Sequence, residues 1–161
     1  MKIYSILPKT LVLIACLLWP FTAKSQDSMF GVWKYSCSDG PCQAFFDLKA
    51  PEADQLAIGM GLIHSGETDE ATLILRTPIR SALPPGMRLT ITEDRKTDIP
   101  FQFCDDSVCV GFLRLDAETL DALSVTETVD VTYIMYGQRK PIAYTVPING
   151  FAGALDRLKK P

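Results

Sequence analysis

Histidine is almost missing from this chain, since His64 is the single one among 161 residues. One histidine cannot build the multi-histidine sites that often hold zinc. Glycine-rich phosphate loops are missing too: Gly59-Met60-Gly61 lacks a third glycine and lies in a strand-like run instead of opening a helix. The chain has no internal repeat and no low-complexity tract. These absences favour a protein without a bound cofactor or resident metal.

Positive charge is also scarce once the N-terminal segment is set aside. The chain has 16 basic and 19 acidic residues, and residues 1–25 hold Lys2, Lys9 and Lys24 but no acid. The remaining residues therefore carry 13 basic and 19 acidic groups, a net charge of −6. This balance argues against a nucleic-acid partner, which requires an excess of basic residues.

Long apolar runs are limited to one, near the N-terminus. Lys2 and Lys9 precede the apolar stretch Thr10–Ala23, which ends in the small-residue pattern Ala23-Lys24-Ser25. The stretch is 14 residues long and contains Pro20, which is short for a bilayer span of about 20 residues. Residues 1–25 are therefore predicted to be an export signal cleaved before Gln26. Residues 26–161 are predicted to form a single domain.

Two other interpretations of the N-terminal segment stay open. Leu13-Ile14-Ala15-Cys16 fits the loose pattern that precedes a lipidated cysteine, although apolar residues continue beyond Cys16. The segment could also stay uncleaved and hold the domain at the periplasmic face of the inner membrane. Contact with a membrane is expected only through this segment.

Beyond the signal, four cysteines form two C-x4-C pairs: Cys37 with Cys42, and Cys104 with Cys109. An even number of cysteines in an exported chain favours disulfides, with three connectivities open. Turn-forming tetrapeptides inside each pair favour bridges within the pairs. A four-cysteine zinc site is the alternative, but an oxidising compartment competes for its thiols. A thioredoxin-like pair would need two intervening residues at a helix start.

Alternating and β-prone segments dominate the predicted domain. Met87–Glu93 alternates cleanly, with Met87, Leu89 and Ile91 on one face. The expected strands are 30–37, 43–48, 55–64, 72–77, 87–93, 99–104, 108–115, 129–136 and 142–148, several of them paired in hairpins. The fold class is all-β, an antiparallel β-sandwich or flattened barrel of about eight strands, with two short helices and two disulfides.

The two helices are expected at 116–124 and after Asn149-Gly150. Asp116 can cap the first helix, and Leu115 and Leu120 occupy the positions of a hydrophobic staple. Apolar residues recur at helical spacing from Phe151, and Lys159 and Lys160 come last, where cations favour the helix dipole.

No catalytic constellation emerges from the residue pattern. His64 is followed directly by Ser65, and neighbours on a strand point to opposite faces, so His64 is interpreted as an ordinary strand-end histidine. Three acidic pairs fall in predicted turns without the spacing of a calcium loop: Asp69-Glu70, Glu93-Asp94 and Asp105-Asp106. No catalytic and no metal-binding residues are assigned.

Five basic residues within one third of the chain form the candidate partner surface. They are Arg76, Arg80, Arg88, Arg95 and Lys96. Some could share a wet face and meet an acidic partner or a lipid headgroup, although scattered basic residues usually serve solubility. Trp33 and Tyr35 are assigned to the core.

The order of these features resembles the invasion-associated locus B (IalB) family of exported proteins from Gram-negative bacteria. The matching features are Gly31-Val32-Trp33 with Cys37 and Cys42, Leu83-Pro84 with Gly86 and Leu89, Pro100-Phe101 before Cys104 and Cys109, and Asn149-Gly150-Phe151 with Ala154-Leu155. A second proline, Pro85, departs from the family's usual Leu-Pro-x-Gly approach to the central strand. The resemblance implies a small disulfide-bearing all-β envelope or secreted protein without known enzymatic activity, and it transfers only the cysteines, as disulfide partners.

The leading hypothesis is a periplasmic or secreted binding module that engages a protein partner in the envelope. One alternative is an accessory subunit of an inner-membrane complex, tethered by an uncleaved N-terminal segment. Another is an enzyme, either a hydrolase using a carboxylate pair or a thiol-disulfide oxidoreductase using Cys104 and Cys109.

Overall fold

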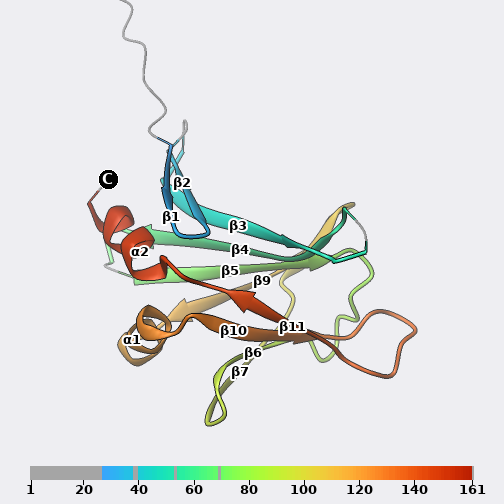
Figure 1. The fold of residues 1–161 in the computed structure, drawn as a ribbon. Helices are drawn as coiled ribbons and strands as arrows, with labels where there is room; N and C mark the ends of the chain where they lie inside the picture. Colours follow the sequence, from blue (N-terminus) through green and yellow to red (C-terminus); the bar gives the residue numbers. More distant parts are fainter. Residues whose placement is uncertain (1–26, 38–39, 53, 69, 161) are drawn as a thin grey trace, which may run out of the picture.

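The computed structural model describes residues 27–37, 40–52, 54–68 and 70–160. The proposed export segment 1–25, including Cys16, lies outside these residues, as does Asp69. Two antiparallel sheets and two helices make up the described part of the chain (Figure 1).

The larger sheet has seven strands in the order β1-β2-β3-β4-β5-β9-β8. Sequence neighbours pair directly from β1 to β5, which reflects a series of hairpins. The chain then leaves this sheet and returns with β8 and β9. The strands are β1 Ser28–Phe30, β2 Trp33–Ser36, β3 Gln43–Lys49, β4 Leu56–Ser65, β5 Glu70–Pro78, β8 Phe103–Cys104 and β9 Val108–Leu115.

The smaller sheet has four strands in the order β11-β10-β6-β7. The strands are β6 Met87–Thr92, β7 Arg95–Ile99, β10 Thr128–Tyr133 and β11 Ile142–Pro147. This sheet crosses one face of the larger sheet, where β11 approaches β4 and β7 approaches β9 (Figure 1). The sheets stay separate, so the fold is a sandwich and not a closed barrel.

One apolar core lies between the two sheets. Alternate residues of β4 and β5 point into it, as the pleat of a strand requires. Trp33 and Tyr35 are fully buried there, in agreement with their assignment to the core. The largest buried side chains also include Ile58, Met60, Leu62, Leu73, Leu75, Met87, Leu89, Ile99, Leu123 and Phe151.

Both predicted helices are present. Helix α1, Ala117–Val125, is capped by Asp116, whose Oδ1 accepts a hydrogen bond from the Thr119 backbone N–H at 2.7 Å. Helix α2, Phe151–Lys159, packs beside β1 and β2 at the end of the molecule where the chain finishes (Figure 1). Phe151 meets Trp33 edge to face, with ring centroids 5.8 Å apart.

The turn after β1 and the turn before α2 pack against each other at two glycines. Gly31 and Gly150 both have positive φ, at 56° and 91°, a region that favours glycine. A Cβ on Gly31 would lie 2.1 Å from the Asn149 carbonyl oxygen, and one on Gly150 would lie 2.1 Å from that of Phe30. The Val32 N–H donates to the Asn149 carbonyl at 3.2 Å. The chain therefore turns at Gly31, and 30–37 is not the single strand expected from its aromatic content.

The described residues form eleven strands, where about eight were expected. The expected strand 99–104 does not exist as one element, because β7 ends at Ile99 in the small sheet and β8 begins at Phe103 in the large one. The strand β7 was not expected at all, because Arg95, Lys96 and Asp98 give it little β-propensity. Its pairing with β6 fixes it as an edge strand.

Both cysteine pairs are joined by disulfides as predicted, Cys37 to Cys42 and Cys104 to Cys109. Each bridge closes a hairpin, β2–β3 in one case and β8–β9 in the other. The four sulfur atoms therefore lie in two separate bridges and not around one zinc site. Disulfides persist in oxidising compartments, so the bridges agree with a location outside the cytoplasm.

The two helices are each nine residues long. Within residues 27–160 as described, no helix combines the length and apolarity that crossing a bilayer requires.

Candidate functional site

The candidate site lies where the chain crosses from the large sheet to the small one. We call this region the crossover corner and define it as residues 78–86, 104–109 and 134–137. Residues 78–86 follow β5 and lead into β6. They include a cis peptide bond between Pro84 and Pro85.

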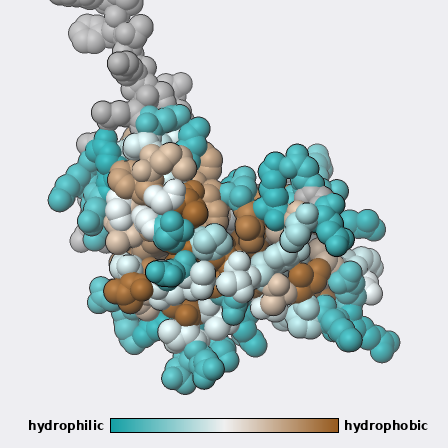
Figure 2. Space-filling model, viewed as in Figure 1, coloured by the Kyte–Doolittle hydropathy of each residue, from teal (hydrophilic) through white to brown (hydrophobic). Residues whose placement is uncertain are grey.

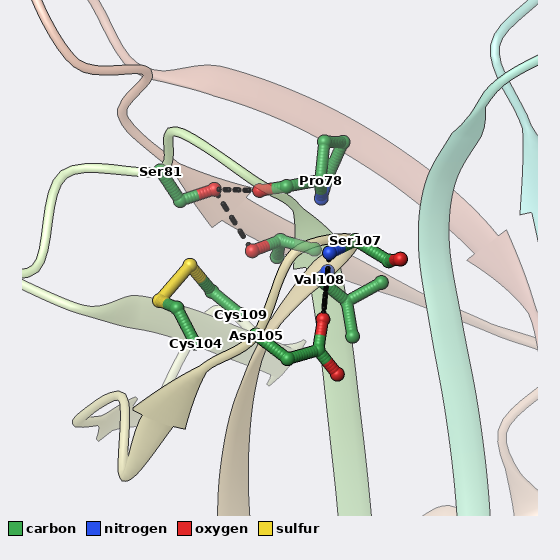
Figure 3. The surroundings of a disulfide bond; sticks show 8 residues. Pro78, Ser81, Cys104, Asp105, Ser107, Val108 and Cys109 are labelled. Carbon is green, nitrogen blue, oxygen red and sulfur yellow. Dashed lines mark hydrogen bonds between the residues drawn. A yellow bond between two sulfur atoms is a disulfide. The ribbon is translucent and has the colours of Figure 1, made fainter.

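Two buried hydroxyl groups fix the start of the crossover. Ser81 Oγ donates to the Pro78 carbonyl at 2.9 Å and lies 2.8 Å from Thr77 Oγ1 (Figure 3). Because the Ser81 proton goes to Pro78, the Thr77 hydroxyl is the donor between the two side chains. Both residues are buried, and these bonds offset the cost of removing their hydroxyls from water.

The β8–β9 hairpin supplies the second part of the corner. The Asp105 carboxylate accepts hydrogen bonds from the backbone N–H groups of Ser107 and Val108, at 2.7 and 2.8 Å (Figure 3). These two bonds hold the pKa of the Asp105 carboxyl below its ordinary value. The Ile79 N–H donates to the Ser107 carbonyl at 3.1 Å, which ties the crossover to the hairpin.

The segment after β10 supplies the third part. The Ala82 N–H donates to the Ile134 carbonyl at 2.7 Å, and the Tyr136 N–H donates to the Arg80 carbonyl at 2.6 Å. Arg80 has a φ of 78°, the single positive φ of a described residue other than glycine. A non-glycine residue in this region is strained, and it persists because the surrounding hydrogen bonds hold it there.

Large apolar side chains are exposed on this fixed backbone. Tyr136 is 80% exposed, Leu83 59% and Ile79 41%. Single exposed apolar residues are ordinary on a protein surface. Here, however, the three exposed apolar residues come from two chain segments that backbone hydrogen bonds join. Arg80 belongs to one of these segments. Aromatic residues and arginine are the types that dominate protein–protein contacts.

The five basic residues predicted as a partner surface lie in several places. Arg88 and Lys96 point to the outer face of the small sheet, and Arg88 forms an ion pair with Asp98 at 2.6 Å. This pair holds the pKa of the Asp98 carboxyl below its ordinary value and that of Arg88 above it. Arg95 pairs with Glu118 at the start of α1.

The other two basic residues lie elsewhere. Arg76 is on the outer face of the large sheet, 2.7 Å from Asp47, and Arg80 is in the crossover corner. The five therefore do not share one face, and only Arg80 belongs to the candidate site.

Residues considered for catalysis lie apart from the corner or serve its turns. His64 is near the end of β4, opposite Ala71 on β5. Glu93 and Asp94 occupy the turn between β6 and β7. Over the described ranges, no group of three histidine, cysteine or acidic side chains is arranged to hold a metal ion.

Sequence reasoning did not identify Ile79, Leu83 or Tyr136. The signal available for Leu83 was an apolar residue inside the Leu83-Pro84-Pro85-Gly86 break. An apolar residue in a predicted loop lacks a strand or helix face on which it would be buried. The contact between the Arg80 and Tyr136 segments had no signal in the sequence.

Comparison with known proteins identifies the family. The family model described as invasion associated locus B (IalB) protein matches residues 33–159. The chain belongs to the IalB family. The match includes both disulfides, the crossover corner and helix α2.

Curated IalB relatives match over part of their length. An invasion protein B homologue of Brucella abortus strain 2308 is 27% identical over 86 residues, which cover 53% of this chain and 50% of the relative. A homologue from Brucella abortus biovar 1 strain 9-941 gives the same values. The chain thus spans about half the length of the curated relatives it matches.

A crystal structure of an IalB protein shares the fold. Invasion associated protein B from Bartonella henselae superposes with a TM-score of 0.74 at 19% sequence identity. The match covers 83% of this chain and 96% of the Bartonella chain. At this identity the likeness establishes the architecture alone.

Proposed function

We propose that this IalB protein is a periplasmic interaction protein that binds a protein partner through the crossover corner. The observation that carries the proposal is the exposure of Ile79, Leu83 and Tyr136 on backbone fixed by hydrogen bonds from three chain segments. A surface that is rigid before binding loses less conformational entropy when it binds. The proposed binding site is therefore preorganised.

The proposed compartment has two supports. Residues 1–25 have the pattern of an export signal. Both disulfides fit the oxidising periplasm of a Gram-negative bacterium. The names of the Brucella and Bartonella relatives refer to invasion, but the proposal here is limited to partner binding in the envelope.

Site-specific photo-crosslinking in the native organism tests the proposal. A photoreactive phenylalanine analogue replaces Tyr136 or Leu83 in the full chain. The matched control places the same analogue at Thr128 of β10, an exposed residue on the outer face of the small sheet. We expect one protein to be crosslinked from both corner positions and not from Thr128.

A second variant separates specific binding from proximity. Changing Tyr136 to Ala removes the most exposed aromatic of the corner without touching its backbone hydrogen bond. We expect the crosslink from Leu83 to fall by about tenfold, since aromatic residues often dominate interfaces. Equal crosslinking from Leu83 with and without Tyr136, or from Thr128, would refute the corner as the binding site. If the captured protein is a subunit of an inner-membrane complex, the chain acts as an accessory subunit of that complex.

A further inference from the structure

The outer face of the large sheet carries a continuous apolar row. Strand pairing aligns Phe45 of β3, Gly61 of β4, Ile74 of β5 and Phe112 of β9 side by side. Phe103 of β8 extends the row, because its ring centroid lies 6.2 Å from that of Phe112. Four strand spacings separate Phe45 from Phe103, or about 19 Å. Helix α2 and the small sheet pack on the opposite face.

The row contains both a depression and an exposed aromatic ring, that of Phe112. Gly61 has no side chain, and the surface above it is hollowed by about 190 Å³ between Phe45 and Ile74, with Gln43 and Arg76 completing the lining. Sites for small molecules usually measure roughly 300 to 1,000 Å³, so this depression suits one large side chain. Phe112 is two strands away, about 10 Å, and is 40% exposed.

Each charge on this face has a partner of opposite sign. Six charged residues of the described strands point to the face: Lys34, Asp47, Lys49, Glu70, Arg76 and Arg114. Arg76 pairs with Asp47 at 2.7 Å and Arg114 with Glu70 at 3.2 Å. Lys34 pairs with Asp27 at 3.3 Å, and Lys49 pairs with Asp54.

Gly59 makes the central pair possible. It lies between Asp47 and Arg76 in the strand register. A Cβ on Gly59 would be 2.7 Å from both Asp47 Oδ1 and Arg76 Nε, so the ion pair crosses β4 where no side chain stands. The outer face is thus neutral, although residues 26–161 carry a net charge of −6.

We propose that a second copy of this chain docks on the outer face of the large sheet, with Phe112 of each copy seated in the depression over Gly61 of the other. A two-fold interface is self-complementary, so a protrusion and a matching depression must occur on the same surface. Two acidic molecules repel least where each presents a neutral face. This inference is independent of the crossover corner, which lies outside the apolar row.

On the side of the molecule drawn in Figure 2, brown apolar patches lie between white and teal residues.

Sedimentation velocity of the protein purified from its native envelope without reductant, over a range of concentrations, tests the proposal. We expect a reversible dimer, and we expect Phe112→Asp to raise its dissociation constant by about tenfold or more. Gly61→Val should do the same by filling the depression. Its Cβ would meet Ile74 at an ordinary 3.4 Å, and a β-branched residue suits a strand, so the variant should fold. Thermal unfolding of both variants checks folding.

Tyr136→Asp is the matched control, because it also replaces an exposed aromatic residue with an acid but lies in the crossover corner. It should leave the dimer unchanged. Raising the salt concentration should not weaken the dimer, since no charged pair forms between the copies. A monomer at all concentrations, a dimer that Phe112→Asp and Gly61→Val leave intact, or one that salt dissociates would overturn the proposal.

Discussion

Two glycines carry the contact between the ends of the domain. Gly150 has a positive φ, and a Cβ there would overlap the Phe30 carbonyl oxygen at 2.1 Å. We expect Gly150→Ala to lower the free energy of unfolding by at least about 1 to 3 kcal/mol, the usual cost of strained backbone. Urea denaturation measures it.

The control for this variant is Gly66→Ala, because a Cβ on Gly66 meets nothing within 4 Å. A surface change of this kind should stay within about 0.5 kcal/mol. Equal stability of the two variants would show that the contact between Gly31 and Gly150 contributes little.

A second prediction at the residue scale concerns Asp105. Hydrogen bonds from Val108 and Ser107 lower the pKa of its carboxyl in the folded state. A lowered folded pKa gives stability that is present above the unfolded pKa of about 3.9 and is lost as the pH falls through the folded value. The stability difference between the parent and Asp105→Asn should therefore be constant from pH 7 to 5 and shrink below about pH 4. Thermal melts across this range measure it, and a constant difference down to pH 2 would contradict the assignment.

At the scale of single elements, the accuracy of sequence reasoning depended on whether the determinants are local. Asp116 caps α1 with a bond to Thr119, three residues away, so the helix could be predicted from adjacent residues. The alternation in 129–133 likewise revealed β10. By contrast, β7 forms because β6 offers it a partner, and its own residues are mostly polar. Likewise, the turn at Gly31 depends on a distant residue, because the Val32 N–H donates to the carbonyl of Asn149, far along the chain.

The candidate site could be predicted less well than the fold for the same reason. The pairing of the cysteines could be predicted because turn-forming residues separate the two members of each pair. The corner depends on bonds between the Ile79 and Ser107 segments and between the Tyr136 and Arg80 segments, which no local pattern encodes.

The β8–β9 bridge is expected to matter more for binding than for stability. Cys104 and Cys109 are five positions apart, and closing so short a loop contributes less than about 3 kcal/mol. Replacing both with Ala should leave the domain folded but reduce crosslinking from Tyr136, because Ser107 in the same hairpin holds Ile79. Denaturation curves and crosslink yields measure the two effects.

The matched control is the double replacement of Cys37 and Cys42 by Ala. That bridge also spans five positions, but it closes the β2–β3 hairpin. It should cost similar stability without changing the crosslink yield. An equal loss of crosslinking in both double variants would mean that the effect comes from general loosening of the domain.

At the scale of the whole molecule, cleavage of the N-terminal segment determines whether the protein is released into the periplasm or held at the membrane. We expect protein purified from its native envelope without reductant to have the intact mass of a chain that begins at Gln26. That mass should be lower by four hydrogens, because each of the two disulfides removes two. Mass spectrometry before and after thiol alkylation measures both properties. A mass that retains Met1 would instead indicate a membrane-anchored protein, and added alkyl groups would reveal free thiols.

The contact between Gly31 and Gly150 also bears on the order in which the molecule can be built. Both disulfides join cysteines five positions apart, so each can form as soon as its own hairpin has reached the oxidising compartment. The turn after β1 is different, because its partners are Asn149 and Gly150, among the last residues of the domain. As the chain emerges into that compartment from its N-terminus, Trp33 therefore stays without Phe151 until nearly the whole chain has arrived. Trp33, the first fully buried aromatic residue of the core, is therefore among the last to complete its native packing.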